Sequence, residues 1–110
     1  MTSPLDKKKS AEETKYSRTA DFEFKAISRR NKLLGLWAAE ILGLSKIESE
    51  EFARQTVLSD FEEPGDEDVL RKIFGDLKKA SSEITEVDIR NKMDELLDTA
   101  KSQIESEAKD

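Results

Sequence analysis

The sequence predicts an all-α protein, an antiparallel four-helix bundle preceded by a flexible N-terminal segment. Apolar residues recur at three- and four-residue spacing in four separate stretches, which is the period of amphipathic helices. No stretch shows the two-residue alternation that marks a half-buried β-strand. The links between the four stretches are short, and helices joined by short links pack as antiparallel neighbours.

Composition limits the function as well as the fold. The chain has 110 residues, enough for one domain with a modest core, and charged residues make up 40% of it. It contains no cysteine and no histidine, which removes thiolate chemistry and the usual general base. No apolar run approaches the ~20 residues that cross a bilayer, and the N-terminus lacks the apolar region of a secretory signal. We therefore expect a cytoplasmic protein that does not insert into membranes and is not an enzyme.

Charge is divided unevenly along the chain. Residues 1–43 hold nine basic and six acidic side chains, whereas residues 44–110 hold ten basic and nineteen acidic ones. The basic part could meet an acidic partner surface, or the two parts could attract each other within the fold. Charge alone leaves both interpretations open.

The first twenty residues differ from the rest. They carry few large apolar side chains, chiefly Leu5 and Tyr16, and a run of three lysines at 7–9. Such a segment cannot bury enough surface to offset the entropy of ordering its backbone, so we expect it to be disordered or marginally helical on its own. The predicted organisation is a mobile segment at 1–20 followed by the bundle at 21–110.

The first predicted helix spans 21–43 and carries a broad apolar stripe. Gly43 is expected to end it in the left-handed conformation. Gly35 lies inside it, where glycine costs ~1 kcal/mol relative to alanine, and this suggests a close approach of another element. The stripe comprises Phe22, Ala26, Ile27, Leu33, Leu34, Trp37, Ala38 and Ile41.

Three further helices follow. Ser45 and Glu48 have the spacing of a capping box at the start of the second helix, and Thr85 and Asp88 form a weaker equivalent at the start of the fourth. The acids of 66–68 suit the start of the third helix and Lys78 and Lys79 its end. The expected packed faces comprise Phe52, Ala53, Thr56, Val57 and Phe61 in the second helix, Val69, Leu70, Ile73, Phe74 and Leu77 in the third, and Ile89, Met93, Leu96, Leu97, Ala100 and Ile104 in the fourth.

No catalytic or metal-binding motif is recognisable in the sequence. The sequence has no P-loop, dinucleotide-binding glycine motif or nucleophile elbow. A calcium loop starting at Asp60 fails because Pro64 and Arg71 occupy ligand positions. Arg29, Arg30 and Lys32 form a basic cluster, but the overall pI of about 4.8 argues against nucleic-acid binding.

Two blocks of the sequence resemble a known family. The segments FKAISRRNKLLGLWAA, residues 24–39, and DFEEPGDEDV, residues 60–69, are similar to the zeta subunit of the alphaproteobacterial F-type ATP synthase, an ATPase inhibitor. Ser28 departs from the family pattern, which has alanine there. The resemblance weakens between residues 44 and 57 and in the fourth helix.

The resemblance implies a fold, a partner and a mechanism. It implies a four-helix bundle whose mobile N-terminal segment enters the catalytic head of the ATP synthase and blocks rotation in the hydrolytic direction. Lys15, Tyr16 and Arg18 are then the candidate anchors, because aromatic and arginine side chains dominate binding hot spots. The protein would be a monomer when free and peripheral to the inner membrane when bound. No cofactor is required, although ADP or ATP is implied as a regulatory ligand of the bundle.

Two anionic partners remain open for the basic cluster. In the first alternative, Arg29, Arg30 and Lys32 bind nucleotide phosphates, and Asn31 or Trp37 meets the base or ribose. In the second, Arg29 and Arg30 pair with the acids of residues 60–68. A different function also stays open, namely a stand-alone nucleotide-sensing bundle that acts on another protein.

Overall fold

Four α-helices make up the structure, a computed structural model that describes the backbone of residues 4–62, 65–80 and 83–108 and the side chains of 20–60, 65–80 and 83–107. Helices α1 (Pro4–Leu42), α2 (Lys46–Glu62), α3 (Asp66–Lys79) and α4 (Glu86–Ala108) follow one another through short links. Within these ranges there is no strand. The predicted all-α class and four-helix bundle are confirmed.

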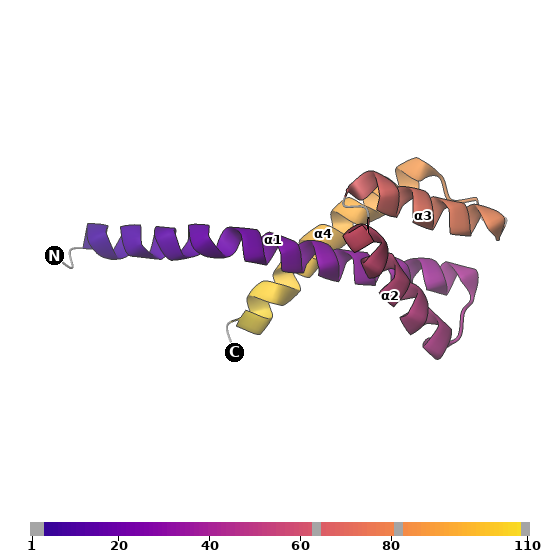
Figure 1. Cartoon of the computed structure of the whole chain (residues 1–110), viewed down its shortest axis with the longest axis horizontal. Helices are drawn as coiled ribbons and strands as arrows, with labels where there is room; N and C mark the ends of the chain where they lie inside the picture. Colours follow the sequence, from indigo (N-terminus) through magenta and orange to yellow (C-terminus); the bar gives the residue numbers. More distant parts are fainter. Residues whose placement is uncertain (1–3, 63–64, 81–82, 109–110) are drawn as a thin grey trace.

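Helix α1 is the axis of the molecule. Its 39 residues extend for roughly 58 Å at 1.5 Å per residue, which accounts for most of the 63 Å length of the protein. The C-terminal half lies among the other helices, and the N-terminal half projects beyond them (Figure 1). The helix thus begins at Pro4, well before the expected start at Asp21, and whether residues 1–20 are mobile stays a prediction.

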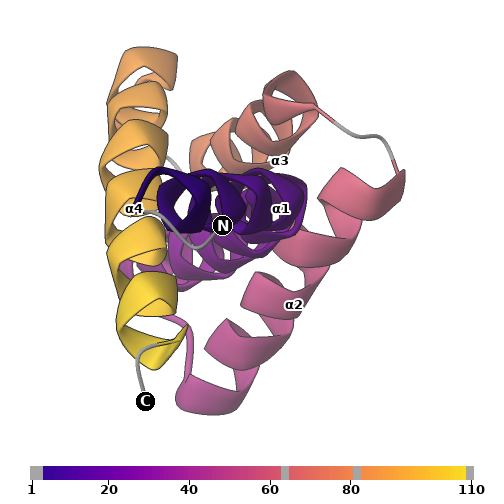
Figure 2. The ribbon, with the colours of Figure 1, turned by 90° about the vertical axis from the view of Figure 1, so that its left-hand side faces the viewer.

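The other three helices surround the C-terminal half of α1. Viewed along α1, α2 and α4 lie on either side of it and α3 lies above (Figure 2). Each of the three contacts α1, and in the described part of the chain α2 and α4 do not contact each other. Helices α1 and α3 run in one direction and α2 and α4 return, with α2 and α4 crossing α1 obliquely (Figure 1).

The core lies between α1, α3 and α4. Its buried cluster comprises Leu34, Ala38, Val69, Leu70, Ile73, Leu77, Ile89 and Met93. Trp37, Phe52, Phe74 and Leu96 are partly buried against this cluster, as the predicted stripes require. Ile41 is an exception among the predicted core residues, because it lies in the last turn of α1, next to the link to α2, and is 40% exposed. Phe61 lies outside the described side chains.

Local chemistry fixes the ends of the helices. Ser45 and Glu48 exchange hydrogen bonds with each other's backbone amides at 3.2 and 3.0 Å, which confirms the capping box of α2. Thr85 and Asp88 do the same at 3.2 and 3.0 Å before α4. Gly43 has φ of 72°, the left-handed conformation predicted after α1. The N-terminus of α2 is therefore placed directly beside the C-terminal end of α1.

Small residues allow α2 to lie directly on α1. Gly35 of α1 faces Ala53 and Thr56 of α2, and all three are buried. A Cβ atom at Gly35 would be only 2.7 Å from Ala53 Cα and 2.9 Å from Thr56 Oγ1. The mid-helix glycine therefore marks a close approach of two backbones, as the sequence suggested.

Candidate functional site

A groove of about 610 Å³ opens beside the middle of α1. Helix α1 forms most of it, and α2 and α4 contribute the other walls. Apolar side chains and three cations share the lining. The lining residues are Phe24, Lys25, Ser28, Arg29, Lys32, Val57, Ile104 and Glu107.

The helical period explains why α1 presents these residues together. Lys25, Arg29 and Lys32 are spaced by four and three residues, so they form one row along the helix surface. Phe24 and Ser28 form the neighbouring row one residue earlier. The apolar contribution is Phe24, which is 55% exposed, together with Val57 and Ile104. The site is thus an apolar groove with a basic rim on a rigid helix.

Two of the three rim cations already hold a carboxylate. Lys25 Nζ lies 3.2 Å from Asp21 Oδ2, one turn earlier on α1. Both guanidinium NH groups of Arg29 donate to the Glu107 carboxylate, at 2.8 and 2.9 Å, and Nη1 also donates to Gln103 Oε1 at 2.8 Å. The hydrogen bond from Arg29 lowers the pKa of the Glu107 carboxyl, and the same bond raises the pKa of Arg29. This contact joins α1 to the last turns of α4.

Replacing Arg29 by glutamine is expected to raise the pKa of the Glu107 carboxyl towards its ordinary value, because its main stabilising hydrogen bonds disappear. Since the folded-state pKa is depressed, the stabilisation from this pair is present above the unfolded-state pKa and is lost as the pH falls through the folded-state value. A carboxyl-carbon NMR titration measures the shift. Lys101→Gln, which removes a cation that pairs with Glu23 instead, is the control. A Glu107 pKa that is the same in the native chain and in Arg29→Gln would refute the pairing.

The next residue, Arg30, points to a different side of α1, towards α3. Its side chain is 2% exposed, and its Nη2 atom lies 2.8 Å from Asp66 Oδ1 at the start of α3. Its Nε atom donates to Asn31 Oδ1 at 3.0 Å. Asn31 is also buried, and its Nδ2 atom has no hydrogen-bond partner. Arg30 therefore belongs to the joint between α1 and α3, Asn31 is buried beside it, and neither residue lines the groove.

The Arg30–Asp66 pair is expected to matter for stability. Asp66→Asn leaves a buried guanidinium without its carboxylate, but Asp66 itself is 60% exposed, so water limits the loss to about 1–2 kcal/mol. Urea unfolding measures it. Glu67→Gln removes the same charge from the first turn of α3 and breaks only an exposed pair with Arg90, so its effect on stability should be clearly smaller. Equal losses in the two variants would show that Arg30 does not depend on Asp66.

Trp37 lies in the core and away from the groove. It packs against the buried cluster, and Lys92 Nζ of α4 lies 5.7 Å from the centroid of its ring. A cation at this distance over an indole face gives a weak additional attraction. Trp37 therefore helps to hold α4 against α1.

The five residues predicted to bind nucleotide are thus divided. Arg29 and Lys32 line the groove, whereas Arg30, Asn31 and Trp37 contribute to helix packing. The alternative that the arginines pair with the acidic segment 60–68 is confirmed for Arg30 and wrong for Arg29, whose partner is Glu107 of α4. Adjacent helical residues differ by about 100° in direction, which separates the two arginines.

The groove also contains residues that the sequence did not single out. Phe24, Lys25 and Ser28 could have been found by drawing α1 as a helical wheel around Arg29 and Lys32. Val57, Ile104 and Glu107 lie on other helices, and nothing in the local sequence predicts that they line this groove. The residues that α2 and α4 contribute to the site can therefore be identified only from the structure.

Lys15, Tyr16 and Arg18 lie on the projecting half of α1, where the backbone is helical. Their side chains are outside the described part of the structure. Their predicted role as anchors in a partner therefore stays a prediction.

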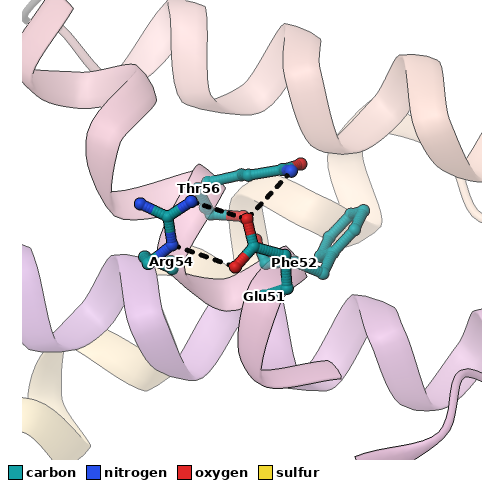
Figure 3. A network of polar contacts seen from close by, with 5 residues as sticks. Glu51, Phe52, Arg54 and Thr56 are labelled. Carbon is teal, nitrogen blue, oxygen red and sulfur yellow. Dashed lines mark hydrogen bonds and ion pairs between the residues drawn. The ribbon is translucent and has the colours of Figure 1, made fainter. Parts of the chain in front are cut away.

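Several other polar contacts in the described residues lie within a single helix. On the exposed face of α2, Arg54 donates to Glu51 at 3.0 and 2.6 Å, and on the buried face Thr56 Oγ1 donates to the Phe52 carbonyl at 2.9 Å (Figure 3). Pairs of exposed residues on one helix contribute little stability and form no cavity. No group of residues suited to hold a metal ion occurs in the ranges described. No helix there has the length and apolar character needed to cross a membrane.

A comparison with models of known protein families identifies one family. The family model described as "ATPase inhibitor subunit zeta" matches residues 1–103. A solved structure, titled "Solution NMR structure of the protein", is similar with a TM-score of 0.68 and 47% identity, covering 77% of this chain and 96% of the other. No curated protein matches the chain.

Proposed function

Because the chain belongs to the ATPase inhibitor subunit zeta family, we propose that it inhibits ATP hydrolysis by an F-type ATP synthase through the N-terminal half of α1. This half enters an interface of the catalytic head and blocks rotation in the hydrolytic direction, while the bundle remains outside. The observation that supports the proposal is the projection of α1 beyond the other helices (Figure 1). The chain would act in the cytoplasm, at the membrane periphery, as a regulatory and non-catalytic subunit.

The continuity of α1 suits this role physically. Starting a helix is costly because several residues must be fixed for one hydrogen bond, whereas extending an existing helix adds one bond per residue. The bundle holds the C-terminal half of α1 in helical form, so residues 4–20 extend a helix that is already nucleated. Ordering of the segment in the head therefore costs less than it would for an isolated peptide.

Adding the full-length protein to the isolated catalytic head tests the proposal. ATP hydrolysis is expected to fall with increasing protein concentration and to reach a plateau at saturation. Protein unfolded by heat and added at the same concentrations is the control for non-specific effects. Hydrolysis that is unchanged at saturating concentrations of the native chain would overturn the proposal.

An adenine nucleotide in the groove is a second candidate function. A volume of about 610 Å³ is in the usual range for small-molecule sites, and Phe24 offers a ring face beside the cations Arg29 and Lys32. Titration of the protein with ADP and ATP, followed by amide chemical shifts, should move signals from the groove residues. Lys32→Ala should weaken this binding, and Lys46→Ala, an exposed lysine at the start of α2, should not. Shifts that are absent at millimolar nucleotide would exclude the ligand.

A further inference from the structure

We propose that the groove is a second docking surface for the catalytic head and receives an acidic segment of the head with apolar side chains on one face. This inference rests on the proposed function, because it names the head as the partner. It differs from that function in assigning binding affinity to the bundle and not only to the projecting half of α1.

The geometry of α1 places the groove next to the inserted half. At 1.5 Å per residue, the position of Arg18 lies only about 10 Å along the helix from Lys25. Because α1 is one continuous helix from Pro4 to Leu42, a head that encloses its N-terminal half must approach Phe24 and the residues after it. Hence the groove lies where the surface of the head must come closest to the bundle.

The cations of the groove continue a row that starts on the projecting half. The positions of Arg18, Lys25, Arg29 and Lys32 are separated by seven, four and three residues, which keeps them on one side of a helix. One basic row therefore runs from the inserted half onto the bundle. Asp21 lies on the same side between Arg18 and Lys25 and pairs with Lys25 at 3.2 Å, so an acidic surface of the partner that follows this row must displace Asp21 from Lys25.

The chemistry of the lining selects an acidic and partly apolar occupant. The lining holds three cations and one acid, Glu107, and Asp21 pairs with Lys25 beside it, so the groove keeps a net positive charge in a protein whose net charge is −6. The exposed ring of Phe24 and the side chains of Val57 and Ile104 favour apolar contacts below the rim. Complementary charge across an interface speeds association and selects the partner.

Two observations further limit the kind of segment that can occupy the groove. The bidentate contact between Arg29 and Glu107 shows that the rim accepts a carboxylate at 2.8 Å, so Glu107 acts as an internal competitor. The chain's own segment 4–20 is not complementary, because it carries five basic and three acidic side chains. An acidic partner segment fits the groove where the chain's own N-terminal segment does not.

The test measures binding kinetics of the full chain on immobilised catalytic head in nucleotide-free buffer, and inhibition of hydrolysis in a separate assay that contains ATP. The nucleotide is omitted because it would compete for Arg29 and Lys32. The double variant Lys25→Glu/Lys32→Glu should associate roughly 10- to 100-fold more slowly than the native chain. The matched double variant Lys46→Glu/Lys79→Glu changes the net charge equally at exposed sites on α2 and α3 and should retain most of the native rate.

A variant that is expected to bind more tightly provides a second test of the groove. Glu107→Gln removes the internal competitor and frees Arg29, so it should bind the head more tightly than the native chain, by roughly threefold or more. Raising the salt concentration should reduce the difference between the groove variants and the native chain.

The outcomes separate the two proposals. If the native chain inhibits and the groove variants bind as it does, the docking surface is refuted and the inhibitory function stands. If the native chain binds without inhibiting and the groove variants bind more weakly, docking stands and the inhibitory function fails. Absence of any binding to the head would overturn both.

Discussion

Replacing Gly35 by alanine is expected to lower the free energy of unfolding by about 1–3 kcal/mol, the usual cost of an extra methyl group in a packed contact. The added Cβ would lie 2.7 Å from Ala53 Cα and 2.9 Å from Thr56 Oγ1. The first of these atoms belongs to the backbone of α2, so no side-chain rotation relieves the clash. Helix α2 must move away from α1, and the stability lost exceeds the helix propensity that alanine gains.

Gly75 provides the matched control in α3. It is also a mid-helix glycine, but a Cβ atom there would meet nothing within 4 Å. Gly75→Ala is therefore expected to raise the free energy of unfolding by up to about 1 kcal/mol through helix propensity alone. Urea unfolding followed by far-ultraviolet circular dichroism measures both variants. If both substitutions stabilise the protein, then α2 does not cross α1 at Gly35.

Movement of α2 would also change the shape of the groove. Val57, which lines the groove, follows directly after Thr56, which contacts Gly35. A shift of α2 at the crossing therefore changes the distance between Val57 and the cations of α1. The close contact at Gly35 is thus a condition for the shape of the candidate site as well as for stability.

Local chemistry made much of the fold predictable. The capping boxes at Ser45 and Thr85 need only residues three positions apart, and Gly43 needs only its own backbone conformation. The start of α1 was misplaced for the opposite reason. Before Asp21 there is no apolar stripe, and the helix there is built from residues of good intrinsic propensity, chiefly lysine, glutamate and alanine, which periodicity does not detect.

The candidate site was less predictable because it combines distant residues. The sequence correctly directed attention to residues 29–32 as the basic cluster, and the helical period could have separated Arg29 from Arg30. The partners that decide their roles could not be foreseen. Glu107 is 78 residues from Arg29 and Asp66 is 36 residues from Arg30, and several other acids were equally available in the sequence.

Helix α1 physically joins the projecting half to the groove, and this affects how the two parts contribute to affinity for the partner. A partner that grips residues 4–20 holds a helix whose far end is embedded in the bundle, so the two parts cannot move independently without breaking α1. Contacts at the groove then act at high effective concentration once the projecting half is bound. Weak contacts on the bundle can therefore add substantially to the lifetime of the complex.

Deleting residues 1–19 is expected to abolish inhibition of ATP hydrolysis while the bundle stays folded. The first buried core residue of α1 is Ala26, and the close approach of Gly35 to α2 and the pairs of Arg30 with α3 and Arg29 with α4 all lie after the deletion. The truncated chain loses five basic and three acidic side chains and no described core residue. Circular dichroism and urea unfolding should therefore show a cooperative bundle, whereas a hydrolysis assay with the isolated head should show no inhibition at any concentration.

Single substitutions separate the anchors from the length of the segment. Tyr16→Ala should raise the concentration for half-maximal inhibition by roughly 30-fold, since a hot-spot side chain is worth about 2 kcal/mol or more. Thr14→Ala, two residues away, changes a smaller side chain on the same helix and should have an effect several-fold smaller. If the truncated chain inhibits as well as the full chain, the blocking element must lie in the bundle, and the groove becomes the first place to search for it. If truncation abolishes inhibition but Tyr16→Ala does not weaken it, the length of the rigid helix, and not an aromatic anchor, stops the rotation.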